Sequence, residues 1–121
     1  MCSSDLAAVR LSVKAGSVPE VLAALATSLP AAATIVAHVP AGTIWIAAAP
    51  HELAPVLAPL RDLAQQHAGH LLLARASRQL KAAGDVWFPA PASATTSLMR
   101  GLKQTFDPHN VLNPGRFVAG L

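Results

Sequence analysis

Two hydrophobic periodicities alternate along residues 9–76 of the chain. Apolar side chains at every second position indicate a strand, and apolar side chains three and four positions apart indicate an amphipathic helix. The segment therefore predicts the order strand, helix, strand, strand, helix, strand. The expected elements are a strand at 9–14, a helix capped by Ser17 and closed by Pro30, strands at 34–39 and 43–48, a helix at 51–67 and a strand at 70–76.

The same pattern predicts which side chains form the core. Alternating positions on a strand lie on opposite faces of a sheet, and helical positions three and four apart share one face. Val9, Leu11 and Val13 are expected to face inward from the first strand, and Val21, Leu22, Leu25 and Leu29 form the apolar stripe of the first helix. Ile44 and Ile46 are expected to share one face of the third strand. Thr43 and Trp45 are expected on the other face of the third strand.

Turn and cap residues mark the ends of these elements. Ser17 with Glu20 three positions later is typical of a capping box. The short link Pro40-Ala41-Gly42 predicts a hairpin between the second and third strands. Gly69 is the expected cap at the end of the second helix.

Two features of the second half leave alternatives open. Pro55 and Pro59 both fall within the second helical pattern, so this helix either starts late, near Pro55, or kinks at Pro59. The last strand contains the run Leu71–Leu73, which is apolar throughout. A run of this kind predicts a strand that is central or covered on both faces.

The order of elements is that of a split βαβ unit. We therefore predict an α+β fold: a ferredoxin-like βαββαβ antiparallel sheet with two helices on one face. A partly helical connector at 77–84, an extended stretch at 85–91, a C-terminal helix and an Asn-Pro-Gly-Arg tail follow. No repeat or linker divides the chain, so residues 1–121 are expected to form a single domain.

The C-terminal segment has the most specific sequence in the chain. A helix that Ser93 can cap, with Leu98, Leu102 and Phe106 on one face, is expected to end before Asp107-Pro108. Asn110 tolerates a left-handed backbone, and Asn113-Pro114-Gly115 predicts a second turn that directs Arg116. A capped helix followed by two turns that fasten a tail to a core is the structural interpretation of this pattern.

The wording Lys-x-x-Phe-Asp-Pro-x-x-Val-Leu-Asn-Pro-Gly-Arg also resembles the C-terminal signature of FAD-linked oxidases of the vanillyl-alcohol oxidase type. Together with Asp-Val-Trp-Phe-Pro at 85–89, the segment is most similar to the smaller FAD-binding subunit of bacterial glycolate oxidase. Two positions depart from that subunit, since Gly is expected where Phe88 and Asn110 stand.

The resemblance implies a C-terminal substrate or cap domain of an FAD-dependent 2-hydroxyacid oxidase or dehydrogenase. FAD would be held by an N-terminal FAD-binding domain of the same protein, so the chain is expected to be an inactive fragment in isolation, with residues 1–6 as a non-native start. Asn113 and Arg116 would contribute to the cofactor site. The implied partners are a larger flavin subunit, an iron–sulfur subunit and a small 2-hydroxyacid.

Composition adds limits of its own. Hydrophobic residues make up 53% of the chain and charged residues 12%, which predicts a face normally covered by another protein surface. The net charge of +3 comes from scattered residues, so no nucleic-acid patch is expected. The single cysteine, Cys2, and the lack of a signal or membrane span favour a cytoplasmic location, with peripheral attachment to a membrane through a complex as the second option.

Candidate chemistry is sparse. The sequence has neither a G-x-G-x-x-G nor a Walker motif, so the chain is not expected to bind FAD alone. The five histidines lack metal-site spacing, and no metal is expected. Trp87 is interpreted as a packing residue.

Two other functions compete with the enzyme domain. A free-standing ferredoxin-like module that binds a ligand or regulates a partner is compatible with the fold, because fold does not determine function. It leaves the signature at 85–121 unexplained. An RNA-binding domain of the same topology needs aromatic side chains on the central strands, where only Trp45 is expected.

Overall fold

One four-stranded antiparallel sheet organises the first part of the chain, in the order β2-β3-β1-β4. The computed structural model describes residues 6–82, 84–87 and 94–121. The strands are β1 (Ala7–Ser12), β2 (Thr34–His38), β3 (Thr43–Ala48) and β4 (His70–Arg75). The helices are α1 (Val18–Ser28), α2 (Pro50–Leu53), α3 (Leu57–Gln66), α4 (Arg78–Ala82) and α5 (Ala94–Phe106).

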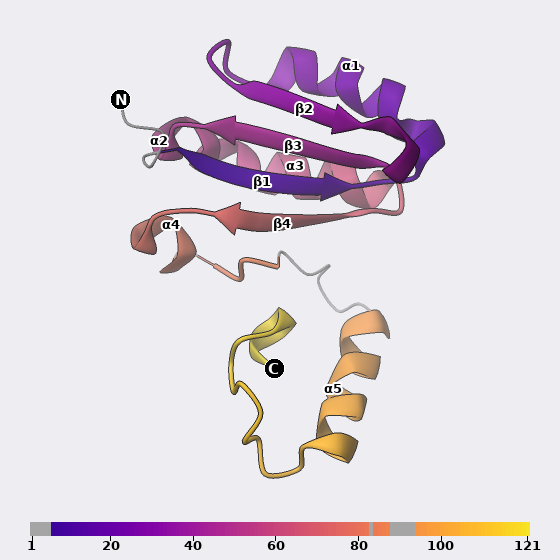
Figure 1. Ribbon diagram of the computed structural model, residues 1–121, viewed down its shortest axis with the longest axis vertical. Helices are drawn as coiled ribbons and strands as arrows, with labels where there is room; N and C mark the ends of the chain where they lie inside the picture. The colour runs from indigo at the N-terminus through magenta and orange to yellow at the C-terminus, as the bar shows by residue number, and fades with distance from the viewer. Residues whose placement is uncertain (1–5, 83, 88–93) are drawn as a thin grey trace.

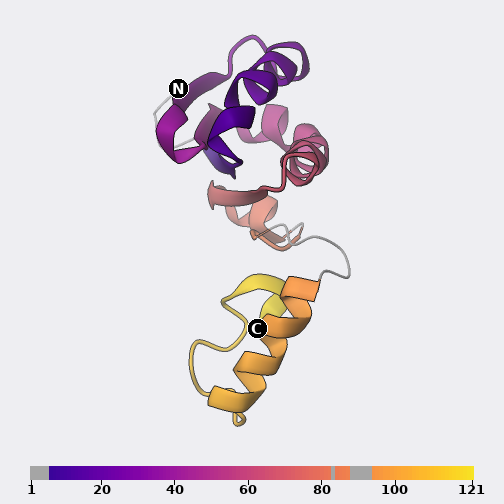
Figure 2. The same ribbon diagram turned by 90° about the vertical axis from the view of Figure 1, so that its right-hand side faces the viewer.

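This arrangement confirms the predicted α+β, ferredoxin-like fold. α1 connects β1 to β2, and α2 with α3 connects β3 to β4, so each helix links two strands that are not neighbours in the sheet. Both α1 and α3 cover the same face of the sheet, as the two views in Figures 1 and 2 show. No helix among the described residues covers the other face, the helix-free face.

The core lies between the sheet and these helices, and alternation along the strands produces it. Val9, Leu11, Ile44 and Ile46 are fully buried and Val13 nearly so, as the period of two predicts. On the helical side the buried residues include Val18, Val21, Leu25, Leu57 and Leu60, with Leu22 and Leu29 packed at the margin. Each buried Leu or Ile side chain contributes about 1.5–3 kcal/mol to folding.

The predicted capping box at the start of α1 is wrong. Ser17 is the N-cap residue, but its side chain makes no capping hydrogen bond, and its backbone is already helical because a 3₁₀ turn (Ala15–Ser17) precedes it. The Glu20 carboxylate instead lies 3.7 Å from Nδ1 of His67, just beyond α3. A side-chain oxygen caps a helix from an extended residue, which Ser17 is not.

The prediction for Gly69 is also wrong, for an informative reason. Ala68 takes the left-handed conformation after α3, with φ of 55°, and Gly69 N–H then donates to the Ala64 carbonyl at 2.8 Å. Gly69 is needed for space: a Cβ there would lie 2.0 Å from the Ser12 carbonyl oxygen. The glycine thus permits the close passage of the chain past the end of β1.

Neither alternative for the second helix holds as stated: helical structure already begins at Pro50 in α2, and the interruption falls at Pro55 and not at Pro59. A 3₁₀ turn at Ala54–Val56 contains Pro55 and separates α2 from α3. Pro59 lies in the first turn of α3, where its missing N–H leaves no hydrogen bond unmade, and the helix runs through it to Gln66.

β4 lies at an edge of the sheet, so the prediction of a central strand is wrong. Leu71 and Leu73 face the core and Leu72 is half-buried on the opposite face. The free edge is partly covered, since the Leu73 N–H donates to the Val86 carbonyl at 2.8 Å. A covered edge explains why an outer strand can be apolar throughout.

The helix-free face of the sheet carries a row of side chains across all four strands. Val36 pairs with Trp45, Trp45 pairs with Arg10, and Arg10 pairs with Leu72. Val36 is 60% exposed and Trp45 is 41% exposed. Arg10 Nε is buried without a hydrogen-bond partner in the part of the chain that the structure describes.

α5 and the tail that follows it lie beyond the β4 edge of the sheet (Figures 1 and 2). α4 confirms the predicted partly helical connector, and α5 ends at Phe106, as the Asp107-Pro108 pair predicts. The described part of the predicted extended stretch, Asp85–Trp87, is instead a turn that the Asp85 carboxylate closes by accepting the Trp87 N–H, so the prediction is wrong there. The predicted cap Ser93, the rest of that stretch and most of the suspected non-native start lie outside the described residues.

Candidate functional site

Asp107 is the centre of the C-terminal segment. Its Oδ1 accepts the Val111 N–H at 2.9 Å, and its Oδ2 accepts the Leu112 N–H at 2.9 Å and the Lys103 ammonium at 2.5 Å. Lys103 also donates to the Leu112 carbonyl at 2.8 Å. One carboxylate therefore joins the last turn of α5 to the loop after it.

The electrostatics of Asp107 follow from these contacts. The carboxylate side chain is only 4% exposed, and each hydrogen bond favours its charged form. The Lys103 ammonium, followed by the N–H groups of Leu112 and Val111, lowers the pKa of Asp107 from 3.8 to about 2. Asp107 is therefore a fixed anion at neutral pH and has a structural role here.

Two turns shape the loop, and the sequence predicts both. Asn110 adopts a left-handed backbone with φ of 51°, and its N–H donates to the Asp107 carbonyl at 3.0 Å. In the second turn Arg116 N–H donates to the Asn113 carbonyl at 3.1 Å, with Gly115 at φ of 70°. Asn113 itself has φ of 45°, which Asn accepts more readily than most residues.

The tail is tied back to the connector by Asp85 and Trp87. Asp85 Oδ2 accepts the Ala119 N–H at 2.5 Å, and Oδ1 accepts the Trp87 N–H at 2.9 Å. The Trp87 and Phe117 rings meet edge to face, with centroids 5.1 Å apart. The Asp-Val-Trp and Arg-Phe-Val parts of the signature, 30 residues apart in the chain, thus pack against each other.

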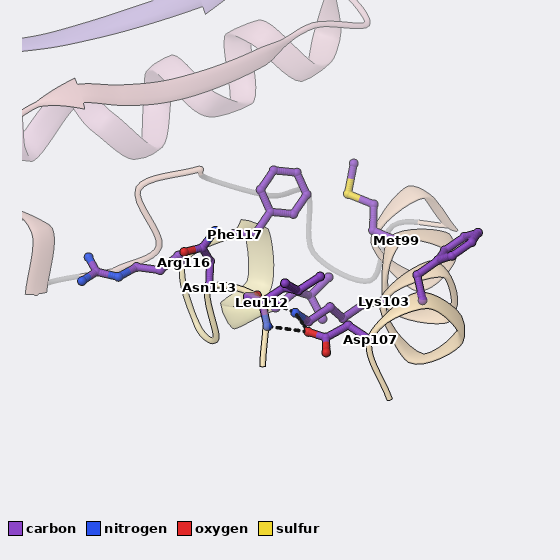
Figure 3. A pocket seen from close by; sticks show the side chains of 9 residues that line it. Met99, Lys103, Asp107, Leu112, Asn113, Arg116 and Phe117 are labelled. Atoms are coloured by element: carbon purple, nitrogen blue, oxygen red, sulfur yellow. Dashed lines mark hydrogen bonds and ion pairs between the residues drawn. The ribbon is translucent and has the colours of Figure 1, made fainter. Parts of the chain in front are cut away.

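α5 and the tail border an open cavity of about 420 Å³. Figure 3 shows its labelled side chains. Met99, Lys103 and Asp107 line it from the α5 side, and Leu112 and Phe117 line it from the tail. The wall is largely apolar, with the Lys103–Asp107 pair as its charged part. Cavities of this size suit one small ring system.

The two sequence-predicted site residues both border this cavity, but they do not converge. Asn113 lies beside Leu112 and the Lys103–Asp107 pair, whereas the Arg116 side chain points away from the other labelled residues (Figure 3). Asn113 can offer an amide to a ligand in the cavity. Arg116 contributes its backbone and stem there and directs its guanidinium elsewhere.

The outer surface of this unit is strongly apolar. Leu98, Leu102 and Phe106 share one face of α5, as predicted, and are 65%, 50% and 78% exposed. Val111 is 74% exposed. Exposed apolar side chains gathered on one small unit mark a surface that another protein surface covers.

Sequence reasoning missed the roles of Asp107, Lys103 and Asp85. It assigned Asp107 only to the end of the helix, although a Lys four residues before it has a spacing that allows an ion pair. No local signal predicts that Asp85 bonds to Ala119, because that contact spans 34 positions.

Metal-binding clusters and membrane-spanning helices are both absent from residues 6–82, 84–87 and 94–121. No three His, Cys, Asp or Glu side chains there lie close enough together to hold a metal ion. None of the helices in the same ranges is both long and apolar enough to cross a bilayer.

Of the comparisons with known proteins, the one with family models matches this part of the chain. The family model of FAD linked oxidases, C-terminal domain, matches residues 87–117. The match starts at Trp87 and ends at Phe117, the two rings in contact. The comparison with curated proteins and the comparison with solved structures each found no match.

The fold is thus α+β, and the match supports a C-terminal domain of an FAD-linked oxidase, a class of flavoprotein oxidoreductases. FAD binding is a property of that family, and the match covers residues 87–117 only.

Proposed function

We propose that the chain is the C-terminal domain of an FAD-dependent 2-hydroxyacid oxidase or dehydrogenase of the glycolate oxidase type. In this proposal it closes the flavin site from the substrate side and contacts the other subunits. The observation that carries the proposal is the clamp of Asp85 and Trp87 on Ala119 and Phe117. This clamp brings together the two ends of the family-matched segment, and the α5 helix of that segment exposes an apolar face.

The residues present fit one part of FAD only. The cavity of about 420 Å³ suits the edge of a planar ring, with apolar walls and the Asn113 amide as a polar contact. The sequence has no glycine-rich loop for a pyrophosphate. The remainder of the cofactor would therefore be held by an N-terminal FAD-binding domain of the same protein.

When bound, FAD would supply hydride acceptance from the α-carbon of the 2-hydroxyacid. The residues of this chain would contribute by holding a polar contact in place at the cavity and by excluding water from it. The Lys103–Asp107 pair holds the loop against α5, so the Asn113 amide has a fixed place at the cavity. Leu112, Phe117 and Met99 would keep water from the site.

In this proposal, the partners would bind to the apolar faces of α5 and of the sheet. The α5 stripe of Leu98, Leu102 and Phe106 would pack on the FAD-binding domain, since it belongs to the family-matched segment. The larger flavin subunit and the iron–sulfur subunit of a glycolate oxidase complex are the further proposed partners. Exposed Val36 and Trp45 on the helix-free sheet face support a second contact surface.

Asn113 provides the sharpest test of the cofactor side. Its φ of 45° suits glycine, so Asn113→Gly removes the amide and preserves the turn. In the protein assembled with its FAD-binding domain and partners, we expect this variant to retain FAD several-fold less well, measured as flavin absorbance after dialysis. Asn110→Gly is the matched control, because Asn110 has φ of 51° and lies outside the cavity. Equal flavin retention in the two variants would contradict a role for Asn113.

A further inference from the structure

A second cavity, of about 520 Å³, lies between the segment after β4 and the tail. It shares Arg116 and Phe117 with the first cavity and adds Lys81, Asp85 and Trp87. Arg116 is the residue whose side chain turns away from the first cavity in Figure 3. Lys81 comes from α4 and Arg116 from the Asn-Pro-Gly-Arg turn, so two separate elements each supply a cation.

The charges of this cavity do not balance within the part of the chain that the structure describes. Neither Lys81 nor Arg116 forms an ion pair or a side-chain hydrogen bond with another described residue. Asp85 is the acidic residue of the lining, and both of its oxygens accept backbone N–H groups, from Trp87 and Ala119. Two cations and one carboxylate leave a net charge of +1 at the wall.

The rest of the wall is apolar and accessible. The edge-to-face rings of Trp87 and Phe117 border the cavity together with Val86 and Ala119. Gly84, Gly115 and Gly120 add no side chains, and open space surrounds each of them. The cavity therefore combines a cationic side with an aromatic side.

We propose that this cavity binds a monocarboxylate that carries an apolar or aromatic body. Lys81 and Arg116 hold the carboxylate, with the guanidinium as a two-pronged donor, and the body lies against Trp87 and Phe117. A single negative charge neutralises the wall, whereas a phosphate dianion would leave an excess charge of −1 beside Asp85. The site adjoins the proposed flavin side at Arg116 and Phe117, but its ligand is held by Lys81, Arg116 and the two rings and does not require FAD.

The test uses the 121-residue chain and benzoate as the probe. The two tryptophans are the reporters, because Trp87 lines the cavity and Trp45 lies on β3, on the sheet. We expect benzoate to shift the indole N–H resonance of Trp87 saturably in NMR spectra and to leave that of Trp45 in place. Acetate, which has the charge alone, should bind more weakly, and neutral benzamide should cause no saturable shift.

Variants assign the cations. Lys81→Gln and Arg116→Gln should each raise the Kd for benzoate by about fivefold to tenfold, and Arg116→Lys should raise it less. Arg78→Gln on α4 and Arg100→Gln on α5 are the matched controls and should leave the Kd unchanged, since neither residue lines the cavity. An unshifted Trp87 resonance in each ligand-free variant verifies that the cavity is intact.

Three results would overturn the proposal: no saturable shift of Trp87, an unchanged Kd in Lys81→Gln and Arg116→Gln, or tighter binding of inorganic phosphate than of benzoate. Flavin content of the assembled protein is not a readout here. The failure of this site is thus distinguishable from the failure of the proposed enzyme domain.

Discussion

Asp107 shows how a single side chain can organise a signature sequence. Its two oxygens hold the loop at Val111 and Leu112, and its ion pair holds Lys103. Pro108 after it ends the helix, and Asn110 lets the chain reverse. The Lys-x-x-x-Asp-Pro-x-Asn-Val-Leu part of the sequence is therefore explained by local hydrogen bonding before any ligand is considered.

Asp107→Asn is predicted to loosen this loop without unfolding the sheet. An amide has one acceptor oxygen and no charge, so it cannot bond to both N–H groups and to Lys103 as the carboxylate does. We expect the amide protons of Val111 and Leu112 to exchange roughly tenfold faster, while those of β1 and β3 keep their rates. Asp62→Asn, which removes the exposed pair with Arg61, is the control and should change neither set.

The pH dependence of the same loop has a defined sign. Because the folded-state pKa of Asp107 is lowered from 3.8 to about 2, its contribution is fully present above about pH 4. It is lost progressively as the pH falls through this range toward 2. Hydrogen exchange of Leu112 should therefore accelerate, beyond the intrinsic pH effect, below about pH 4 in the parent chain. The same acceleration in Asp107→Asn would contradict the assignment.

At the scale of residues, the sequence predicts which residues adopt turn conformations better than it predicts side-chain hydrogen bonds. The turn residues Asn110 and Gly115 were predicted from their backbone preferences, which are intrinsic to each residue. Asp85 could not be predicted in this way, since its Ala119 partner becomes a neighbour only after the tail folds back. Gly69 was misassigned because a close approach to Ser12 leaves no trace in the local sequence.

At the scale of elements, two glycine-to-alanine variants are predicted to change stability in opposite directions. One of them, Gly69→Ala, lies where the α3–β4 link passes the end of β1. Gly69→Ala places a Cβ 2.0 Å from the Ser12 carbonyl oxygen, so we expect a loss of unfolding free energy of about 2 kcal/mol or more. Gly101→Ala in α5 meets no atom within 4 Å and should stabilise α5 by about 0.5–1 kcal/mol. Urea unfolding measures the first, and helix content by circular dichroism with amide exchange measures the second. A neutral Gly69→Ala would refute the close approach.

The apolar stripe of α5 gives a second prediction at this scale. Leu98→Gln combined with Leu102→Gln should change the unfolding free energy by no more than about 0.5 kcal/mol, because both side chains are exposed. The same pair should reduce self-association of the chain, measured by light scattering and dye binding. Leu60→Gln is the contrasting variant and should cost about 3 kcal/mol or more, because Leu60 is 1% exposed. An unchanged association state in the double variant would argue against α5 as a contact surface.

Element order was predictable and element environment was not. Periodicity predicts the order of the four strands and of the helical segments between them in residues 7–75, because a strand or helix buries its apolar side chains at its own period. It does not predict that the second helical segment is divided into α2 and α3. The apolar run of β4 suits an edge position because Val86 accepts a hydrogen bond from Leu73 there, and this contact is tertiary and leaves no local signal. The α5 stripe had the correct period, yet in this chain it faces solvent, since period alone does not say what covers a face.

At the scale of the whole molecule, two parts meet at Asp85–Trp87. The sheet with its two covering helices has its own core, and α5 with its tail is fastened to the β4 edge through Val86, Asp85 and Trp87. The apolar surface is concentrated on α5 and its tail and on the helix-free side of the sheet. An apolar fraction of 53% is consistent with a chain that completes its structure against other protein surfaces.

The FAD content of two forms of the protein tests most directly whether the chain is one domain of an FAD-dependent enzyme. One form is the 121-residue chain, and the other is the protein purified from its native locus with the complete reading frame. We predict about one FAD per polypeptide in the second form, by flavin absorbance, and no saturable FAD binding by the first, because its sequence has no pyrophosphate-binding loop. Saturable binding of FAD by the 121-residue chain, or a complete protein without flavin, would contradict the account.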